Sequence, residues 1–305
     1  MKPALRLGLL PLWRDKDTVQ IGVDPRRAVA ISGMSGAAEV IRLLDGSRDR
    51  DQLIAEAGRH GVPARVTERI IGLLAVASAI VDFPSEVLRS MPPELRRQLM
   101  PVLATASLSA QDADGGASVL ARRSSCTVQV RGDGPVAALV ADLLTRSGLA
   151  AAGPASDPRR ASPPDLLVLV GRPSLDETTR LLRSRQPYLV VDASEAIGVV
   201  GPLVRPGVTA CLRCIDLVKA QRDPAWPLIL AQLADRSADP CGCDAVLATS
   251  VAAQAAAQAV AFADRSQLPP ATVNATLELV LPSWQWRRRS WLPHPACICG
   301  SSCAS

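Results

Sequence analysis

The chain has 305 residues, of which 48% are hydrophobic and 3% are aromatic, and its formal net charge is +5. This composition excludes a globally disordered chain, because it supplies enough apolar surface for a substantial core. The positive charge is mild and comes almost wholly from arginine, so it does not by itself indicate nucleic-acid binding. The length suits one large domain or two smaller ones.

The apolar stretches of the sequence lack the pattern of a targeting or membrane segment. The stretch 5–13 is short, has no small-residue cleavage site and meets charged residues at once, unlike a secretory signal. The stretch 245–263 is rich in alanine but contains threonine, serine and two glutamines, so it predicts a buried helix rather than a membrane span. We therefore expect a cytoplasmic protein with reduced cysteines and no membrane partner.

Residues 1–83 predict a small domain that begins with a hairpin. The stretch 18–23 is its first strand, Asp24 and Pro25 supply turn chemistry, and 28–31 is the returning strand. The stretch 5–13 is a candidate third strand.

Three helices are expected after this hairpin. Ser35 is placed to cap the first, which ends at Gly46, and the second covers 49–59. The third begins at Pro63 and continues to about residue 81. A small sheet beside three short helices is the pattern of a winged-helix domain.

Peptide capture fits this domain better than DNA binding. The third helix carries Arg65 and Arg69, balanced by Glu68, which are few contacts for a DNA-reading helix. A strand with a free edge can accept a peptide as an added strand, while a helix beside it supplies a groove. The candidate peptide-binding residues lie on the returning strand and the third helix: Ala28, Val29, Ala30, Ile31, Val66, Arg69, Ile70 and Leu73. We expect no nucleic-acid partner, although a ligand-free scaffold and a winged-helix DNA-binding regulator remain as alternatives.

Residues 84–124 predict a connector. Pro84, Pro92 and Pro93 interrupt the chain, and 94–103 is a short amphipathic helix. The stretch 109–116 has the composition of a flexible linker, and 118–123 leads into the next strand.

Residues 125–305 predict an α/β domain that begins with a strand, a glycine turn and a helix. The turn carries Gly132, Gly134 and Ala137 in a G-x-G-x-x-A pattern, which can bare backbone N–H groups for a phosphate. The glycines could equally serve only to let strand and helix pack closely. Further strands at 166–170 and 188–191 indicate a mainly parallel sheet with helices on both faces.

Four cysteines in two short-range pairs indicate a metal site. Cys211 and Cys214 form a C-x-x-C pair, and Cys297 and Cys299 form a C-x-C pair far downstream. Four thiolates are a ligand set for tetrahedral, structural Zn²⁺, and they leave no open position for a catalytic water. Two disulfides or buried free thiols are the alternatives. Cys241 and Cys243 could replace the downstream pair, or bind a second metal with Cys303.

Tryptophan and arginine alternate near the end of the chain. Trp284, Trp286 and Trp291 flank the arginines at 287–289, as in a strand with one packed face or in a protein interface. Trp226 lies between two prolines and could likewise anchor an interface.

Several longer motifs carry a resemblance to a known family. LLDGSR at 43–48 and the hairpin at 21–27 resemble the peptide-recognition domain (RiPP recognition element) of leader-binding subunits of thiazole/oxazole-modified microcin (TOMM) cyclodehydratases. The second domain resembles the ThiF-like, ubiquitin-activating-enzyme superfamily, and its microcin branch matches at 201–207, 211–216, 222–227 and 294–300. The resemblance implies a winged-helix-like recognition domain followed by a ThiF-like, Rossmann-type α/β domain with a zinc site.

The same resemblance implies a function in making a ribosomally synthesised peptide natural product (RiPP). The chain would bind the leader of a precursor peptide and present the core to a YcaO-type ATP-dependent cyclodehydratase, with a homodimer as a possible assembly. Adenylating relatives need an acidic residue after the second strand, phosphate-binding cations and an aspartate near magnesium. Here the run after Gly148 is not acidic, no lysine lies between Lys16 and Lys219, and Gly171 stands where that aspartate is expected. We therefore expect no catalytic residues and no ATP cofactor, with an active ThiF-type adenylating enzyme acting on a peptide carboxylate as the alternative.

Overall fold

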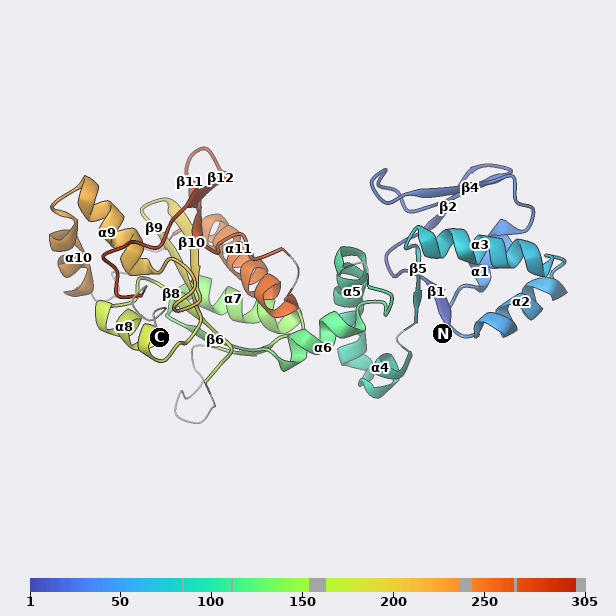
Figure 1. Cartoon of the computed structure of the whole chain (residues 1–305), viewed down its shortest axis with the longest axis horizontal. Coiled ribbons are helices and arrows are strands. Elements are labelled where there is room, and N and C mark those ends of the chain that lie inside the picture. The colour runs from blue at the N-terminus through green and yellow to red at the C-terminus, as the bar shows by residue number, and fades with distance from the viewer. Residues whose placement is uncertain (84, 111, 154–162, 236–242, 266–267, 300–305) are drawn as a thin grey trace. The chain divides into compact units, whose positions relative to one another are not determined.

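The computed structural model describes residues 1–83, 85–110, 112–153, 163–235, 243–265 and 268–299. The chain divides into two compact units, Met1–Ala121 and Arg122–Ser305 (Figure 1). Cys241 and Cys303, which were considered as further metal ligands, lie outside the described residues, as do Pro84 and Gln111.

The first unit contains two small antiparallel sheets. Strands β2 (Pro11–Asp15), β3 (Thr18–Ile21) and β4 (Val29–Ser32) form a three-stranded sheet in that order, and β1 (Pro3–Leu5) pairs with β5 (Ile80–Asp82). The third strand expected over 5–13 is present as β2, but its start was wrong, because a turn separates β1 from β2. Gly8 within that turn has a positive φ of 88°, which a continuous strand does not permit.

Three helices pack against these strands. They are α1 (Ala37–Leu43), α2 (Arg50–Arg59) and α3 (Ala64–Val76). Asp49 caps α2 in a capping box with Gln52. The expected cap by Ser35 was wrong, because α1 begins after Gly36, which is left-handed and makes no side-chain cap. Helix α3 ends five residues earlier than expected, since the chain turns back into β5.

The connector is helical rather than loose. It forms α4 (Ser85–Ser90), α5 (Pro93–Ala110) and α6 (Ala117–Ser125). The expected linker over 109–116 was wrong, because its polar residues make turn contacts: the carboxylate of Asp114 accepts from the N–H groups of Gly116 and Ser118.

A buried arginine that directly follows β1 holds the connector to the first unit. Arg6 is 3% exposed, its Nε donates to the carbonyl of Ser78 (2.7 Å), and its Nη1 donates to Ser107 Oγ and the carbonyl of Asp112 (both 3.1 Å). These contacts join segments about a hundred residues apart, which explains why α5 belongs to the first unit.

The second unit is built on one seven-stranded mixed sheet in the order β12-β11-β10-β9-β8-β6-β7. Its strands are β6 (Thr127–Arg131), β7 (Ala150–Ala152), β8 (Leu166–Val170), β9 (Tyr188–Ser194), β10 (Ile197–Val204), β11 (Ala275–Val280) and β12 (Gln285–Ser290). Strands β7, β6, β8 and β9 are parallel, whereas β9 to β12 pair antiparallel. The mainly parallel sheet that we expected was therefore wrong for this half. Glu195 and Ala196, both at positive φ, close a tight hairpin between β9 and β10.

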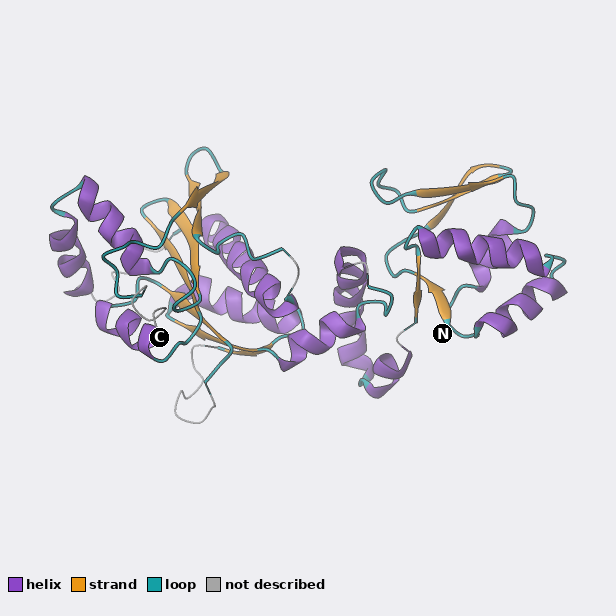
Figure 2. Cartoon of the chain, in the orientation of Figure 1, coloured by secondary structure: helices purple, strands orange, loops and turns teal. Residues whose placement is uncertain are grey.

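Helices cover both faces of this sheet (Figure 2). Helices α7 (Gly134–Arg146) and α11 (Ala245–Asp264) form the core on one face, and α8 (Leu175–Arg183) and α9 (Leu212–Arg222) form it on the other. Helix α10 (Trp226–Asp235) follows α9. Among the described residues, α11 is the one helix long and apolar enough to cross a membrane, and here much of it belongs to the core.

Candidate functional site

The structure brings the two cysteine pairs together. Cys211 is the N-cap of α9, Cys214 lies in its first turn, and Cys297 and Cys299 come from the C-terminal segment. Neighbouring sulfurs are 3.3 to 3.7 Å apart, and the four atoms lie within 4.8 Å of one another. A tetrahedral zinc with Zn–S bonds of about 2.3 Å requires sulfurs about 3.8 Å apart. These residues therefore fit a closed four-sulfur metal site.

The electrostatics of this cluster favour a cation at its centre. Hydrogen bonds from the Cys211 thiol and the His294 amide lower the pKa of Cys214 to about 4. The hydrogen bond to Cys214 and burial raise the pKa of Cys211, and burial raises the pKa of Cys299 to about 12. All four side chains are at most 5% exposed. Four buried thiols cannot all ionise without compensation, whereas a divalent metal supplies it.

The cluster joins the end of the described chain to the body of the second unit. His294 contacts Gln221 of α9 through its ring (3.0 Å), and its carbonyl accepts from the N–H of Cys297 (2.9 Å). Trp291 is buried in the same core and donates from Nε1 to Thr276 Oγ1 (3.0 Å). A metal here would fix the C-terminal segment against α9.

The glycine turn after β6 has a packing role at its first glycine. Gly132 has φ 116°, and a Cβ there would lie 2.2 Å from the carbonyl oxygen of Val170. Only glycine lets β6 and β8 approach so closely. Gly134 is also at positive φ, but a Cβ there would meet nothing within 4 Å. Ala137 is fully buried in the core, so it packs α7 and cannot contact a ligand.

The N-terminus of α7 is poorly equipped for a phosphate. Asp133 occupies the N-cap without a side-chain cap bond and places a carboxylate at this end of the helix. Pro135 follows in the first turn and has no N–H to donate. Gly171 follows β8, and a Cβ at this position would meet no atom within 4 Å. The nearest aspartate one strand on, Asp192, accepts from Ser194 Oγ (2.9 Å).

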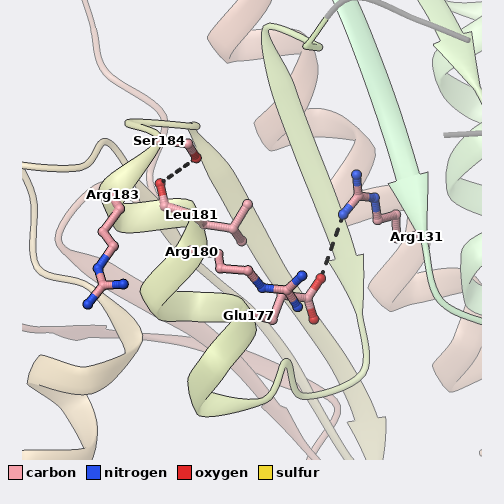
Figure 3. A pocket seen from close by; sticks show the side chains of 6 residues that line it. All are labelled: Arg131, Glu177, Arg180, Leu181, Arg183 and Ser184. Carbon is pink, nitrogen blue, oxygen red and sulfur yellow. Dashed lines mark hydrogen bonds and ion pairs between the residues drawn. The ribbon is translucent and has the colours of Figure 1, made fainter. Parts of the chain in front are cut away.

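A basic hollow of about 500 Å³ lies between the end of β6 and helix α8 (Figure 3). Its lining includes three arginines and one glutamate: Arg131, Arg180, Arg183 and Glu177. Arg131 points toward Glu177, with 3.7 Å between Nη1 and Oε1, and also donates to Gln129. The cation next to the glycine turn is thus bound by a protein carboxylate.

A second charged cluster lies beyond β8, and two of its residues, Asp216 and Trp226, lie in the motifs at 211–216 and 222–227. Arg172 Nη2 donates to both carboxylate oxygens of Asp216 (2.5 and 2.6 Å), and Trp226 Nε1 donates to the same carboxylate (3.2 Å). Lys219 places its ammonium 4.5 Å from the centre of the Trp226 ring. Burial, and secondly Arg172, lower the pKa of Lys219. The one lysine of this unit therefore lies over the ring of a tryptophan that is itself bound to Asp216.

The predicted peptide-binding residues divide into surface and core. Ala30 is exposed on β4, and Arg69 and Leu73 are exposed on α3. Ala28 lies just before β4 and is half-buried, as are Val29 and Val66. Ile31 and Ile70 are 3% and 0% exposed and belong to one core cluster. Both side chains face inward and so cannot contact a peptide, although the main chain of Ile31 lies on the edge strand β4.

Comparison with known proteins shows a shared fold. No family model and no curated protein match the sequence. The heterocyclase TruD superposes with a TM-score of 0.70 at 17% identity, covering 98% of this chain and 43% of TruD. A heterocyclase in complex with substrate and cofactor superposes with a TM-score of 0.71 at 16% sequence identity, covering 98% of this chain and 40% of the heterocyclase chain. E. coli MccB with AMPCPP and MccA superposes with a TM-score of 0.65 at 14% sequence identity, covering 98% of this chain and 100% of MccB.

The likeness is one of fold. The chain spans less than half the length of the two heterocyclase chains and the whole length of MccB. The mixed α/β architecture is shared with these solved structures, and an α/β fold is what the sequence predicted.

Proposed function

We propose that this protein is a non-catalytic adaptor that binds the leader of a ribosomally synthesised precursor peptide. Its first unit would hold the leader, and a YcaO-type cyclodehydratase would act on the core of the same peptide to form azolines. The adaptor contributes effective concentration and orientation rather than bond making. It would work in the cytoplasm, where its thiols stay reduced.

The observation that carries this proposal is the free edge of β4 beside α3. Strand β4 ends the three-stranded sheet and, among the described strands, pairs only with β3. A leader added as a further strand would gain main-chain hydrogen bonds of about 1 kcal/mol net each. Arg69 and Leu73 project from the neighbouring helix and would give the specificity that main-chain bonds lack.

The fold neighbours support a peptide ligand. E. coli MccB has been solved with N-formylated MccA, and one heterocyclase neighbour was solved in complex with substrate and cofactor. Both neighbours have a TM-score of at least 0.62 over 98% of this chain. A peptide substrate is therefore compatible with this architecture.

The glycine turn supports an adaptor rather than an enzyme. Asp133 and Pro135 weaken the anion site at the start of α7, and Gly171 offers no carboxylate for magnesium. Arg131, the cation next to the turn, is paired with Glu177, which leaves less charge compensation for the phosphate groups that adenylation involves.

Zinc has a structural role in this proposal. Cys211, Cys214, Cys297 and Cys299 would hold one Zn²⁺, which stabilises the C-terminal segment against α9. Four sulfur ligands leave no site for a metal-bound water.

Leader binding by the full chain tests the proposal. Fluorescence anisotropy with the labelled cognate leader should show binding, and Leu73→Asp should weaken it roughly ten-fold or more by placing a charge in the groove. Arg69→Glu should weaken an acidic leader more at low salt than at high salt. Arg97→Glu on α5, a similarly exposed arginine, is the matched control. Equal binding by wild type and both folded groove variants would mean that the leader binds elsewhere.

An active adenylating enzyme is the second candidate. The match to the full length of MccB, which was solved with AMPCPP and with ATP, is the observation that favours it. Precursor-stimulated pyrophosphate exchange distinguishes the two functions.

A further inference from the structure

Strand β12 forms one edge of the large sheet. It pairs with β11 through six residues, and among the described strands none pairs with its other side. All six of its residues are exposed. The N–H and C=O groups along that outer side are therefore a template for another strand.

The side chains of this edge are those of an interface. Three consecutive arginines alone could serve to prevent chance strand pairing. Trp284 and Trp286, however, are 44% and 36% exposed on the same hairpin, and large exposed aromatic side chains do not protect an edge. Tryptophan and arginine together are enriched where proteins bind one another.

The three arginines have different roles. Arg288 turns back to its own chain, donating to the carbonyl of Ala271 (2.9 Å) and to Ser290 Oγ (2.8 Å). Arg287 and Arg289 lie on the opposite face of the strand. The guanidinium of Arg289 is 4.7 Å from the ring centre of the buried Trp291, so this charge is held in place.

The carboxylates near this face have partners in the chain itself. Glu278, opposite Arg287 in the register, accepts from Thr276 Oγ1 (3.0 Å), and Asp216 is bound by Arg172 and Trp226. The hairpin of β11 and β12 carries three arginines and one glutamate. An antiparallel copy of β12 would place arginine beside arginine, which is unfavourable. The charge thus indicates an acidic partner and disfavours a second copy of this chain.

We propose that β12 docks an acidic, extended segment of the cyclodehydratase that this adaptor serves. The segment would add as an outer strand, its carboxylates on one face meeting Arg287 and Arg289, and apolar side chains on its other face packing on Trp286. This inference rests on the proposed function, and it adds the surface that holds the enzyme.

The test is binding of the full-length, zinc-loaded chain to its cognate cyclodehydratase, measured by calorimetry at low and high salt. The Arg287→Glu/Arg289→Glu variant should bind the enzyme roughly ten-fold or more weakly, with most of the loss at low salt. The Arg180→Glu/Arg183→Glu variant on α8 makes the same charge change elsewhere in the unit and should bind as wild type does. Labelled leader should bind all three proteins equally.

Each other outcome points to a different failure. If the β12 variant binds the enzyme as tightly as wild type, the docking strand is wrong while the adaptor function stands. If wild type binds leader but not enzyme, the presentation step of the proposed function fails, and the docking inference fails with it. Binding of single-stranded oligonucleotide that the β12 variant loses would assign the edge to nucleic acid and overturn the inference.

Discussion

The second unit contains two candidate ligand sites, a cysteine cluster and a glycine turn, and they differ in completeness. The cluster joins Cys211 and Cys214 to Cys297 and Cys299 across more than eighty residues, and all four sulfurs face one point. The glycine turn is local in sequence, and the nearest charges, the carboxylate of Asp133 and the Arg131–Glu177 ion pair, do not favour a phosphate. The strand, turn and helix around the glycine turn can thus be kept for packing alone. The cysteines come from distant segments, so their meeting at one point is stronger evidence of a ligand site.

The largest expected effect comes from breaking the cysteine cluster. Structural zinc in small domains contributes on the order of 10 kcal/mol to folding. Cys214→Ser should therefore lose the metal and unfold the second unit, because serine is a poor zinc ligand and the C-terminal segment is then no longer fixed against α9. Elemental analysis should find one zinc per chain in wild type and none in the variant. Circular dichroism should show the loss of structure.

Cys243→Ser is the control for this experiment. Cys243 is half-exposed and outside the cluster, so its replacement should leave both zinc and folding unchanged. Zinc retained after replacing both Cys297 and Cys299 would instead show that another ligand set binds the metal.

The glycine turn should respond to substitution through packing. Gly132→Ala brings a methyl group to 2.2 Å from the carbonyl oxygen of Val170, so β6 and β8 must separate. We expect a loss of roughly 3 kcal/mol in the free energy of unfolding. Gly134→Ala meets no atom within 4 Å and should lose only about 1 kcal/mol, because of its positive φ.

Urea unfolding followed by tryptophan fluorescence measures this difference. Four of the five tryptophans belong to the second unit, so the signal reports on that unit. Equal losses at the two glycines would show that close packing at Gly132 is not what the turn provides.

The parts of the fold that follow from local spacing could be predicted from the sequence. Three such features depend only on neighbouring residues. They are the N-terminal ends of two helices at Asp49 and Pro63, the strand and helix around the glycine turn, and the two cysteine pairs. That the two cysteine pairs meet could be inferred, because two thiolate pairs at such spacings together bind one zinc ion.

Features that depend on tertiary contacts could not be predicted in the same way. The antiparallel half of the sheet depends on a hairpin turn at Glu195 and Ala196, which lack the glycine or asparagine that mark such turns. The contacts of Arg6 with Ser107 and of Arg172 with Asp216 involve lone residues far apart in sequence, and no spacing rule marks them. Ile70 repeats with Val66 and Leu73 at helical spacing, but which side of α3 faces the core is decided by packing.

The smallest expected effect is the response of the glycine turn to ATP. Calorimetry should detect no ATP binding, and a precursor peptide should not stimulate pyrophosphate exchange, because Arg131 is bound by Glu177 and Gln129 and Pro135 donates no N–H. Gly171→Asp restores a carboxylate at a position with open space, yet it should not create activity, since Arg131 beside the turn would still be paired with Glu177. Exchange by wild type would make the chain an adenylating enzyme. Exchange by Gly171→Asp alone would show that one missing carboxylate, rather than the cations, accounts for the inactive turn.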